Sequence, residues 1–294
     1  MIRHTAIGLV TAAFLIASCG RSVGEGQESQ GMQESQGKQP KVTVENIKGP
    51  AGSLQVDDGG EGGIPVVFLH SFAGSSAHWK AQLAHLRPNR RAVALDFRGH
   101  GKSEAPDSLD YRVESLAGDV AAVVDGLGIK RFVLVGHSMG GAVGIAYAGA
   151  HPERVAGLLL VGTPGKVPAD QADRIMTSME SDYEKVTESY WNKLLVGAQL
   201  QVLALVRSQM QSVPQDAALS IMRAIFEFDA LPALSAYRGP KLEIITPHGD
   251  SPYALHKLVP GLPHKVVTGT SHWLHMDKPE EFNRILDEFL ATIK

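Results

Sequence analysis

The stretch FVLVGHSMGG, residues 132–141, places four apolar residues of strand type directly before a glycine-rich turn. A helix-compatible segment, Ala142–Ala150, follows at once. The pattern Gly-x-Ser-x-Gly, with Ser138 at its apex, is typical of a sharp strand-to-helix turn that exposes a serine hydroxyl. Gly136 and Gly140 leave room around a strained backbone. The stretch predicts a nucleophilic serine, although a βα turn with an incidental serine would have the same pattern.

Apolar runs and helix-like segments alternate on both sides of this turn. The expected strands are Lys41–Ile47, Ser53–Val56, Val66–Leu69, Arg91–Leu95, Phe132–Val135, Val155–Val161, Leu242–Ile245 and Lys265–Val267. The expected helices among them are Ser76–Leu86, Tyr111–Leu127, Ala142–Ala150 and Pro279–Ile293. Such alternation predicts an α/β fold, with a mostly parallel sheet and helices on both of its faces.

The alternation stops in the stretch from about 164 to 236. Helix-like segments alone occur there, at Ala169–Lys185, Gln199–Gln211 and Pro214–Phe228. Because apolar runs typical of strands return after this stretch, we expect a small helical cap inserted between two parts of one sheet. Its residues are apolar enough to line a pocket.

Composition excludes several classes of protein. The chain has 294 residues, of which 44% are hydrophobic and 20% charged, as in ordinary globular proteins. A formal net charge of −3 argues against a nucleic-acid partner. No apolar run reaches the roughly 18 residues of a membrane-spanning helix. No His, Cys, Asp and Glu cluster has metal-ligand spacing and no glycine-rich loop suits a dinucleotide, so we expect neither metal nor cofactor.

The N-terminus has the features of an export signal. A short basic start precedes an apolar core at Ala6–Ala17, which is too short to span a membrane. Residues 16–19, Ile-Ala-Ser-Cys, resemble the lipobox of bacterial lipoproteins, in which the cysteine is lipidated. We therefore expect a signal peptide at 1–18, a lipid-anchored flexible tether at 19–40 and a domain at 41–294. The protein would be exported and held at the cell envelope through Cys19; an ordinary signal peptide is the alternative.

Four segments of the domain carry a family resemblance. They are the turn at Ser138, the His-x-x-x-Gly turn at His70–Gly74, the Asp-x-Arg-Gly-His-Gly-x-Ser segment at Asp96–Ser103, and Ser271–His275 before the last helix. Each follows an expected strand, and along the chain they come in the order His70–Gly74, Asp96–Ser103, Ser138 and Ser271–His275. In this order they resemble the serine hydrolases of the α/β-hydrolase fold. The resemblance covers most of the domain and implies that fold.

The resemblance also implies a Ser-His-Asp triad. Ser138 would be the nucleophile and His272 its base, with His275 as the rival histidine. Asp250, after the strand at Leu242–Ile245, stands where the family places its acid. Only 21 residues separate it from His272, fewer than is usual, so a helix between them must be short. Two other carboxylates stay open as substitutes, Asp229 and Glu243.

The family's oxyanion hole would use the backbone N–H groups of Phe72 and Met139. This chain has His70-Ser71 where the family usually has His-Gly, and serine adopts positive φ less readily than glycine. His70 is interpreted as a support of this loop. Asp96, Arg98 and His100 are interpreted as structural residues of a tight turn.

These residues predict a serine hydrolase that acts on small-molecule substrates with ester-like bonds. A serine at the apex argues against the haloalkane dehalogenase and epoxide hydrolase branches of the family, which need an aspartate there. It leaves carbon–carbon hydrolase and haloperoxidase-like chemistry open. A non-catalytic ligand-binding protein on the same fold is the rival hypothesis.

Overall fold

The computed structural model describes residues 42–294. The predicted export signal, the predicted lipidation site at Cys19 and the predicted tether lie outside the described residues.

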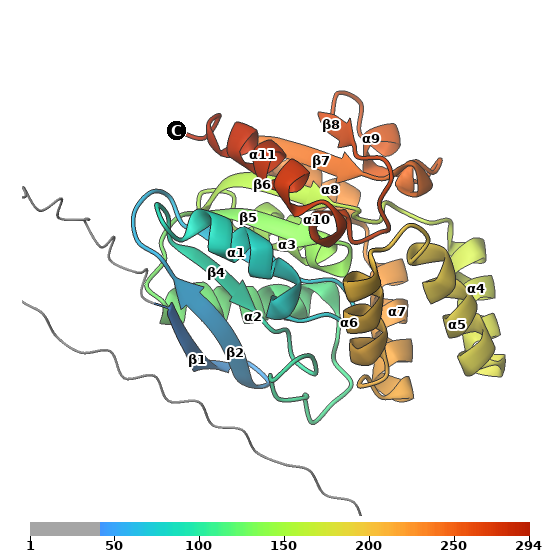
Figure 1. The fold of residues 1–294 in the computed structure, drawn as a ribbon. Coiled ribbons are helices and arrows are strands. Elements are labelled where there is room, and N and C mark those ends of the chain that lie inside the picture. Colours follow the sequence, from blue (N-terminus) through green and yellow to red (C-terminus); the bar gives the residue numbers. More distant parts are fainter. Residues whose placement is uncertain (1–41) are drawn as a thin grey trace, which may run out of the picture. The chain divides into compact units, whose positions relative to one another are not determined.

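Eight strands form one sheet in the order β1-β2-β4-β3-β5-β6-β7-β8 (Figure 1). Strand β2 pairs in antiparallel fashion with both β1 and β4, and the other pairs of the sheet are parallel. The strands are β1 (Val42–Gly49), β2 (Gly52–Gly59), β3 (Val66–Leu69), β4 (Ala92–Leu95), β5 (Phe132–His137), β6 (Val155–Val161), β7 (Lys241–Ile245) and β8 (His264–Val266).

Helices cover both faces of the sheet, as the sequence predicts. Leu134 of β5 faces one hydrophobic core, and its neighbour Val133 faces the other, because successive strand residues point to opposite faces. The first core is closed by α2 (Val113–Gly126), α3 (Met139–Ala150) and α8 (Ala230–Ala236). The second is closed by η1 (Ser76–Trp79), α1 (Lys80–Leu86), α10 (Leu274–Asp277) and α11 (Pro279–Leu290).

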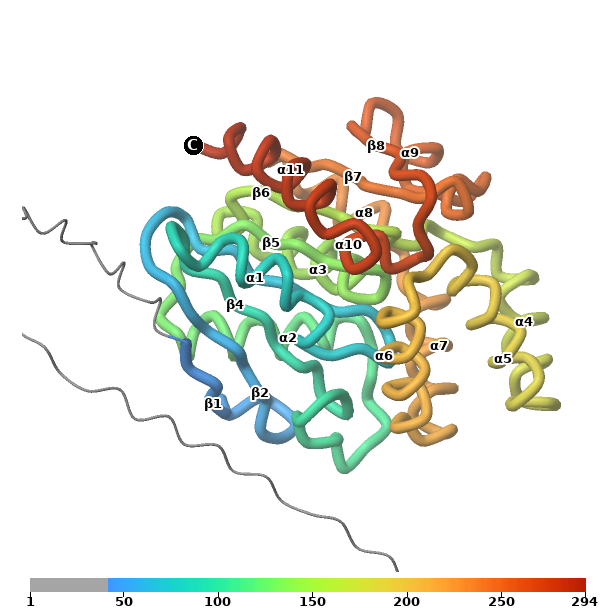
Figure 2. Tube along the Cα trace, viewed as in Figure 1, coloured from blue at the N-terminus to red at the C-terminus, as the bar shows by residue number. Residues whose placement is uncertain are grey.

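The predicted helical cap is present as an insertion of four helices, which gather at one end of the sheet (Figure 2). They are α4 (Ala169–Ser181), α5 (Tyr183–Leu194), α6 (Leu200–Met210) and α7 (Gln215–Glu227). The prediction of a single helix at Ala169–Lys185 is wrong, because the helix is interrupted at Asp182. The carboxylate of Asp182 accepts a hydrogen bond from the N–H of Lys185 and thereby caps α5.

The segment between β7 and β8 is as compact as the spacing predicts. It holds the single turn η2 (Pro247–Gly249) and the helix α9 (Leu255–Leu258), which has only four residues. Across residues 42–294, the longest apolar helices all fall short of what crossing a membrane requires.

Candidate active site

Ser138 lies at the sharp turn between β5 and α3. Its backbone has φ 52° and ψ −116°, a left-handed conformation that is costly for any residue except glycine. Backbone hydrogen bonds of Ser138 stabilise this strained conformation. The Ser138 N–H donates to the carbonyl of Val161 at 2.8 Å, and the Ser138 carbonyl accepts from the N–H groups of Gly141 and Ala142. The predicted exposed-serine turn is confirmed in its backbone geometry.

Two glycines make this turn sterically possible. A Cβ at Gly136 would lie 2.3 Å from the carbonyl oxygen of Gly140. A Cβ at Gly140 would lie 2.5 Å from the carbonyl oxygen of Leu69, at the end of β3. The second contact matters for the site, because it brings the loop after β3 against the first turn of α3.

The two N–H groups predicted to form an oxyanion hole lie on these two segments. Met139 is the first residue of α3, so its N–H has no acceptor within the helix. Phe72 lies in a tight turn that is closed by the Gly74 N–H donating to the Ser71 carbonyl at 3.0 Å. Among the hydrogen bonds of residues 42–294, neither the Met139 nor the Phe72 N–H has a partner. Both donors are thus available to an anion.

The loop that carries Phe72 is supported by a buried histidine. His70 Nε2 accepts the N–H of Phe97 at 3.0 Å, so the proton is on Nδ1, which donates to the Ser71 carbonyl at 2.7 Å. The positive φ of this loop falls on Ala73, at 51°, and not on Ser71. A serine in place of the family's glycine at position 71 therefore adds no backbone strain, because Ser71 does not have a positive φ.

His272 lies in the loop after β8, and its backbone is held at both ends. Its N–H donates to the carbonyl of Leu194 at 2.9 Å, and its carbonyl accepts from His137 Nε2 at 3.0 Å. Gly162 faces the ring, where a Cβ would lie 2.9 Å from Cε1. Burial lowers the pKa of His272 to about 4, so the ring is neutral near pH 7 and can accept a proton.

The rival histidine, His275, lies in the second core. Its ring stacks on Trp79 with a centroid separation of 4.2 Å. Neither ring nitrogen has a hydrogen-bond partner within the described part of the chain, and burial lowers its pKa well below the ordinary value. His272 lines a cavity together with Ser138, and His275 is not among the residues that line it.

Asp250 follows η2 on the loop after β7, but its carboxylate bonds to other residues. Oδ1 lies 3.1 Å from His256 Nε2 and 3.1 Å from Lys257 Nζ, and the Lys257 ammonium holds the pKa of Asp250 below its usual range. No hydrogen bond joins Asp250 to His272 among residues 42–294. A small cavity of about 190 Å³, lined by His272 and Gly249, lies beside this loop.

The two substitute acids are also engaged elsewhere. Glu243 is fully buried on β7, and its Oε2 accepts from both the N–H and Nδ1 of His256 at 3.0 Å. Asp229 caps α8 by accepting the N–H of Leu231 at 3.0 Å. His256 therefore lies between Glu243 and Asp250, and both of its ring nitrogens can donate at once only in the imidazolium form.

A cavity of about 690 Å³ opens over Ser138. Its walls come from the loops of the sheet and from the cap helices, and they are mostly apolar. The lining includes Phe72, Ser138, Ile175, Met179, Val186, Trp191, Leu194, Met222, Ile225, Phe226, His272 and Trp273. The structure thus brings Ser138, His272 and Phe72 together around one apolar space.

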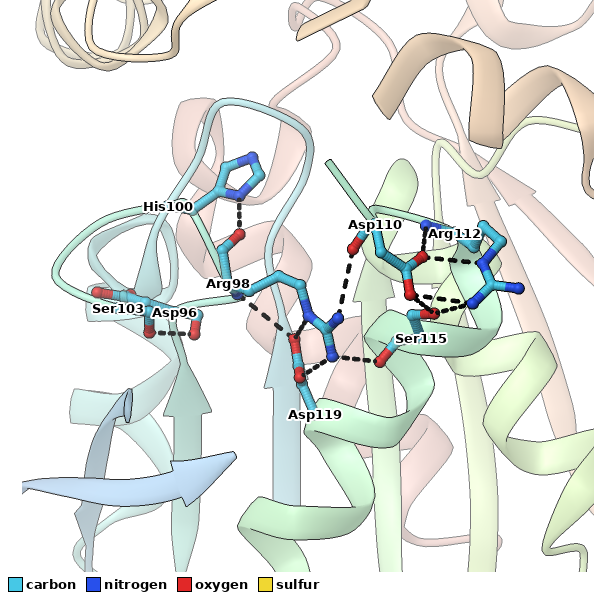
Figure 3. A network of polar contacts seen from close by, with 8 residues as sticks. All are labelled: Asp96, Arg98, His100, Ser103, Asp110, Arg112, Ser115 and Asp119. Atoms are coloured by element: carbon cyan, nitrogen blue, oxygen red, sulfur yellow. Dashed lines mark hydrogen bonds and ion pairs between the residues drawn. The ribbon is translucent and has the colours of Figure 1, made fainter. Parts of the chain in front are cut away.

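The Asp96–Ser103 segment is anchored by polar contacts on the side of α2 (Figure 3). Arg98 donates to both carboxylate oxygens of the buried Asp119, at 2.9 and 2.5 Å. Asp96 accepts the N–H groups of Ser76 and Lys102. The side chains of Asp96 and Arg98 form hydrogen bonds that stabilise the loops around them, in agreement with the structural role expected for these residues.

Sequence reasoning missed three contributors to the site. His137 holds the carbonyl of His272, although nothing in the pattern around Ser138 assigns it a partner. Asp277 bonds to Ser271, and the cap residue Leu194 bonds to His272. The contacts of His137 and Leu194 with His272 join residues far apart in the sequence, so no local signal points to them. Asp277 lies near Ser271 in the sequence, but its other partner, Gln199, does not. Within residues 42–294, no three His, Cys, Asp or Glu side chains are placed to hold a metal ion.

Comparison with known proteins agrees with the fold. The family model of the alpha/beta hydrolase fold matches residues 64–189. A 2-hydroxy-6-oxo-2,4-heptadienoate hydrolase from Pseudomonas putida is 29% identical over 249 residues, which cover 78% of this chain and 90% of that protein.

Solved structures show the same fold over most of the chain. An enol-lactonase from Burkholderia xenovorans has a TM-score of 0.67 and 26% identity, covering 84% of this chain and 100% of its own. A thermophilic esterase from Thermogutta terrifontis has a TM-score of 0.73 and 24% identity, covering 85% and 98%. With its eight-stranded, mostly parallel sheet, its serine turn and its helical insertion, the chain has the α/β-hydrolase fold.

Proposed function

We propose that the protein is a serine hydrolase of ester-like bonds that works through an acyl-enzyme on Ser138. The observation that carries this proposal is that the strained Ser138 and the neutral His272 line one apolar cavity. The N–H groups of Phe72, on the cavity wall, and of Met139, next to Ser138, have no hydrogen-bond partner within residues 42–294. A free serine hydroxyl is a weak nucleophile, and a neighbouring neutral imidazole is the group that activates it. The similar hydrolase and enol-lactonase support this class of chemistry.

In the proposed reaction, Ser138 Oγ attacks the substrate carbonyl while its proton passes to His272. The developing oxyanion accepts hydrogen bonds from the N–H groups of Phe72 and Met139. His272 then gives the proton to the leaving alcohol as the carbon–oxygen bond breaks. A water molecule then attacks the acyl carbon while His272 takes its proton. The His272 imidazolium returns this proton to Ser138 Oγ as the bond between Oγ and the acyl carbon breaks and the carboxylic acid leaves.

The apolar walls favour an apolar acyl group in the substrate. Each methylene that the cavity buries contributes about 0.8 kcal/mol, which is roughly fourfold in kcat/KM. We expect p-nitrophenyl esters to improve by about this factor per methylene from acetate upward, until the chain fills the cavity.

Met222 tests this assignment, because its buried side chain forms part of the cavity wall beside Met176 and Met179. Met222→Trp should fill part of the space and lower kcat/KM for octanoate by about tenfold. Acetate, which does not reach the wall, serves as the internal control and should change little. Equal losses for both esters would place the acyl chain elsewhere.

We further propose that Asp250 is the triad acid, which requires its side chain to leave His256 and Lys257 and enter the small cavity beside His272. Asp250→Asn should lower kcat about 10⁴-fold near neutral pH, because the amide favours the wrong imidazole tautomer. Activity should recover partly at high pH, where hydroxide can replace the base.

The matched control is Asp229→Asn, since asparagine caps a helix as well as aspartate does. We expect its kcat to equal that of the wild type at pH 7. If Asp250→Asn keeps a near wild-type kcat and Asp229→Asn does not, the acid is Asp229.

A further inference from the structure

The cap holds the backbone of His272 directly. Leu194, the last residue of α5, accepts the His272 N–H at 2.9 Å. No hydrogen bond to the imidazole ring of His272 exists within residues 42–294, so the backbone determines where this ring lies. On the other side, His137 Nε2 donates to the His272 carbonyl. One of the two backbone anchors of His272 is therefore a cap residue.

Asp277 makes a second connection between the cap and the same loop. The residue is buried, with 6% of its surface exposed, and its Oδ2 accepts the N–H and the hydroxyl of Ser271 at 2.8 and 2.6 Å. Its Oδ1 accepts the N–H of Gln199 at 2.8 Å, directly before α6. One carboxylate thus joins the residue before His272 to the cap.

The connection between α5 and α6, residues 194–199, also packs on this loop (Figure 2). Trp191 of α5 stacks on Trp273, with ring centroids 5.8 Å apart. Gly197 has φ +86°, and a Cβ there would lie 3.1 Å from the carbonyl of Thr270. Trp191 and segment 194–199 together therefore contact residues on both sides of His272.

We propose that Asp277 is a positioning residue and that the cap segment 194–199 is part of the support of His272. The inference rests on the proposed role of His272 as the base. A buried carboxylate that accepts three hydrogen bonds holds its partners more tightly than neutral acceptors do. When segment 194–199 moves away, His272 loses its Leu194 anchor, and Ser271 loses the cap side of its link. Displacement of this part of the cap then withdraws the base from Ser138.

Gln199 offers a test that leaves every side chain of the site in place. Its φ is −62°, the value that proline imposes, and Pro168 and Pro214 already stand directly before α4 and α7 with φ −56° and −58°. Gln199→Pro removes the N–H that Asp277 accepts. Gln199→Ala, at this exposed side chain, keeps that N–H and is the matched control.

We expect Gln199→Pro to lower kcat for p-nitrophenyl butyrate about tenfold with KM changed less than about twofold. The labelling rate of Ser138 by a fluorophosphonate should fall by the same factor. Gln199→Ala should keep the wild-type values. A wild-type protein that neither hydrolyses the ester nor labels at Ser138 would refute the proposed function. An active wild type with equal kcat in Gln199→Pro and Gln199→Ala would refute this inference alone.

If the Gln199→Pro variant does not fold, Asp277→Asn tests the same inference. The amide must turn its NH₂ group toward either Ser271 or Gln199, so one of the two links is lost. We expect kcat to fall at least tenfold, while Asp287→Asn, at an exposed carboxylate on α11, leaves it unchanged. An Asp277→Asn enzyme with wild-type kcat overturns the proposal.

Discussion

Ser138→Ala is expected to lower the hydrolysis of p-nitrophenyl esters by about 10⁶-fold, because no acyl-enzyme can form without the hydroxyl. The fold should stay intact. Ser138 makes no side-chain cap on α3, and its backbone bond to Val161 does not involve the hydroxyl. Both the assay and a thermal melt are needed, because only a lost rate with an unchanged melting temperature identifies a nucleophile.

Fluorophosphonate labelling followed by mass spectrometry locates the reactive serine directly. We expect the label on Ser138 of the wild type and no label on Ser138→Ala. Ser208→Ala, at an exposed serine of α6, is the control and should label as the wild type does. A wild-type enzyme that hydrolyses esters but carries the label on a different serine would show that the nucleophile is wrongly assigned.

Mild acid is expected to unfold the protein. Burial lowers the pKa of six histidines below the ordinary value of 6.5, namely His70, His78, His100, His137, His272 and His275. As the pH falls through 6.5, the unfolded chain binds protons at these sites and the folded chain does not. The contribution of these histidines to the free energy of unfolding is therefore complete above about pH 6.5, the pKa of histidine in the unfolded chain, and is lost as the pH falls below that value.

The six sites act together in the same pH window. Each of the five whose pKa lies at about 4 or well below 6.5, which are all but His100, loses about 1 kcal/mol between about pH 6.5 and 5.5, so the free energy of unfolding should fall by about 5 kcal/mol over this range. This loss is comparable to the whole stability of an ordinary domain, roughly 5–15 kcal/mol. Urea titrations at a series of pH values, followed by the fluorescence of the buried Trp79, Trp191 and Trp273, measure it.

A single substitution tests the origin of this acid sensitivity. His275→Phe replaces a buried ring without hydrogen-bond partners in residues 42–294 and should remove about 1 kcal/mol of the pH-dependent loss. His248→Gln, at an exposed histidine, should leave the dependence unchanged. A free energy of unfolding that stays constant from pH 7 to about 5.5 would mean that the fold does not hold these imidazoles neutral.

Much of the fold and part of the site can be predicted from local patterns. Continuous apolar runs identify the strands of a sheet that is covered on both faces, and Gly-x-Ser-x-Gly identifies the strained turn at Ser138. These features depend on residues within a few positions of one another, because both the periodicity of a strand and the steric limits of a turn are local properties of the sequence. His272 can be found in the same way, because it follows the last strand and precedes the closing helix.

The sequence by itself therefore determined the order of the strands and helices, the serine turn, and the loops on which Phe72, Asp250 and His272 lie. Only the tertiary structure decided which partners these side chains have. Asp250 bonds to His256, which the buried Glu243 holds in place, and the cap segment 194–199 bonds to the loop of His272. The physical reason is that a loop side chain takes the best partner within hydrogen-bond reach. Packing of distant segments, and not spacing along the chain, determines which partner that is.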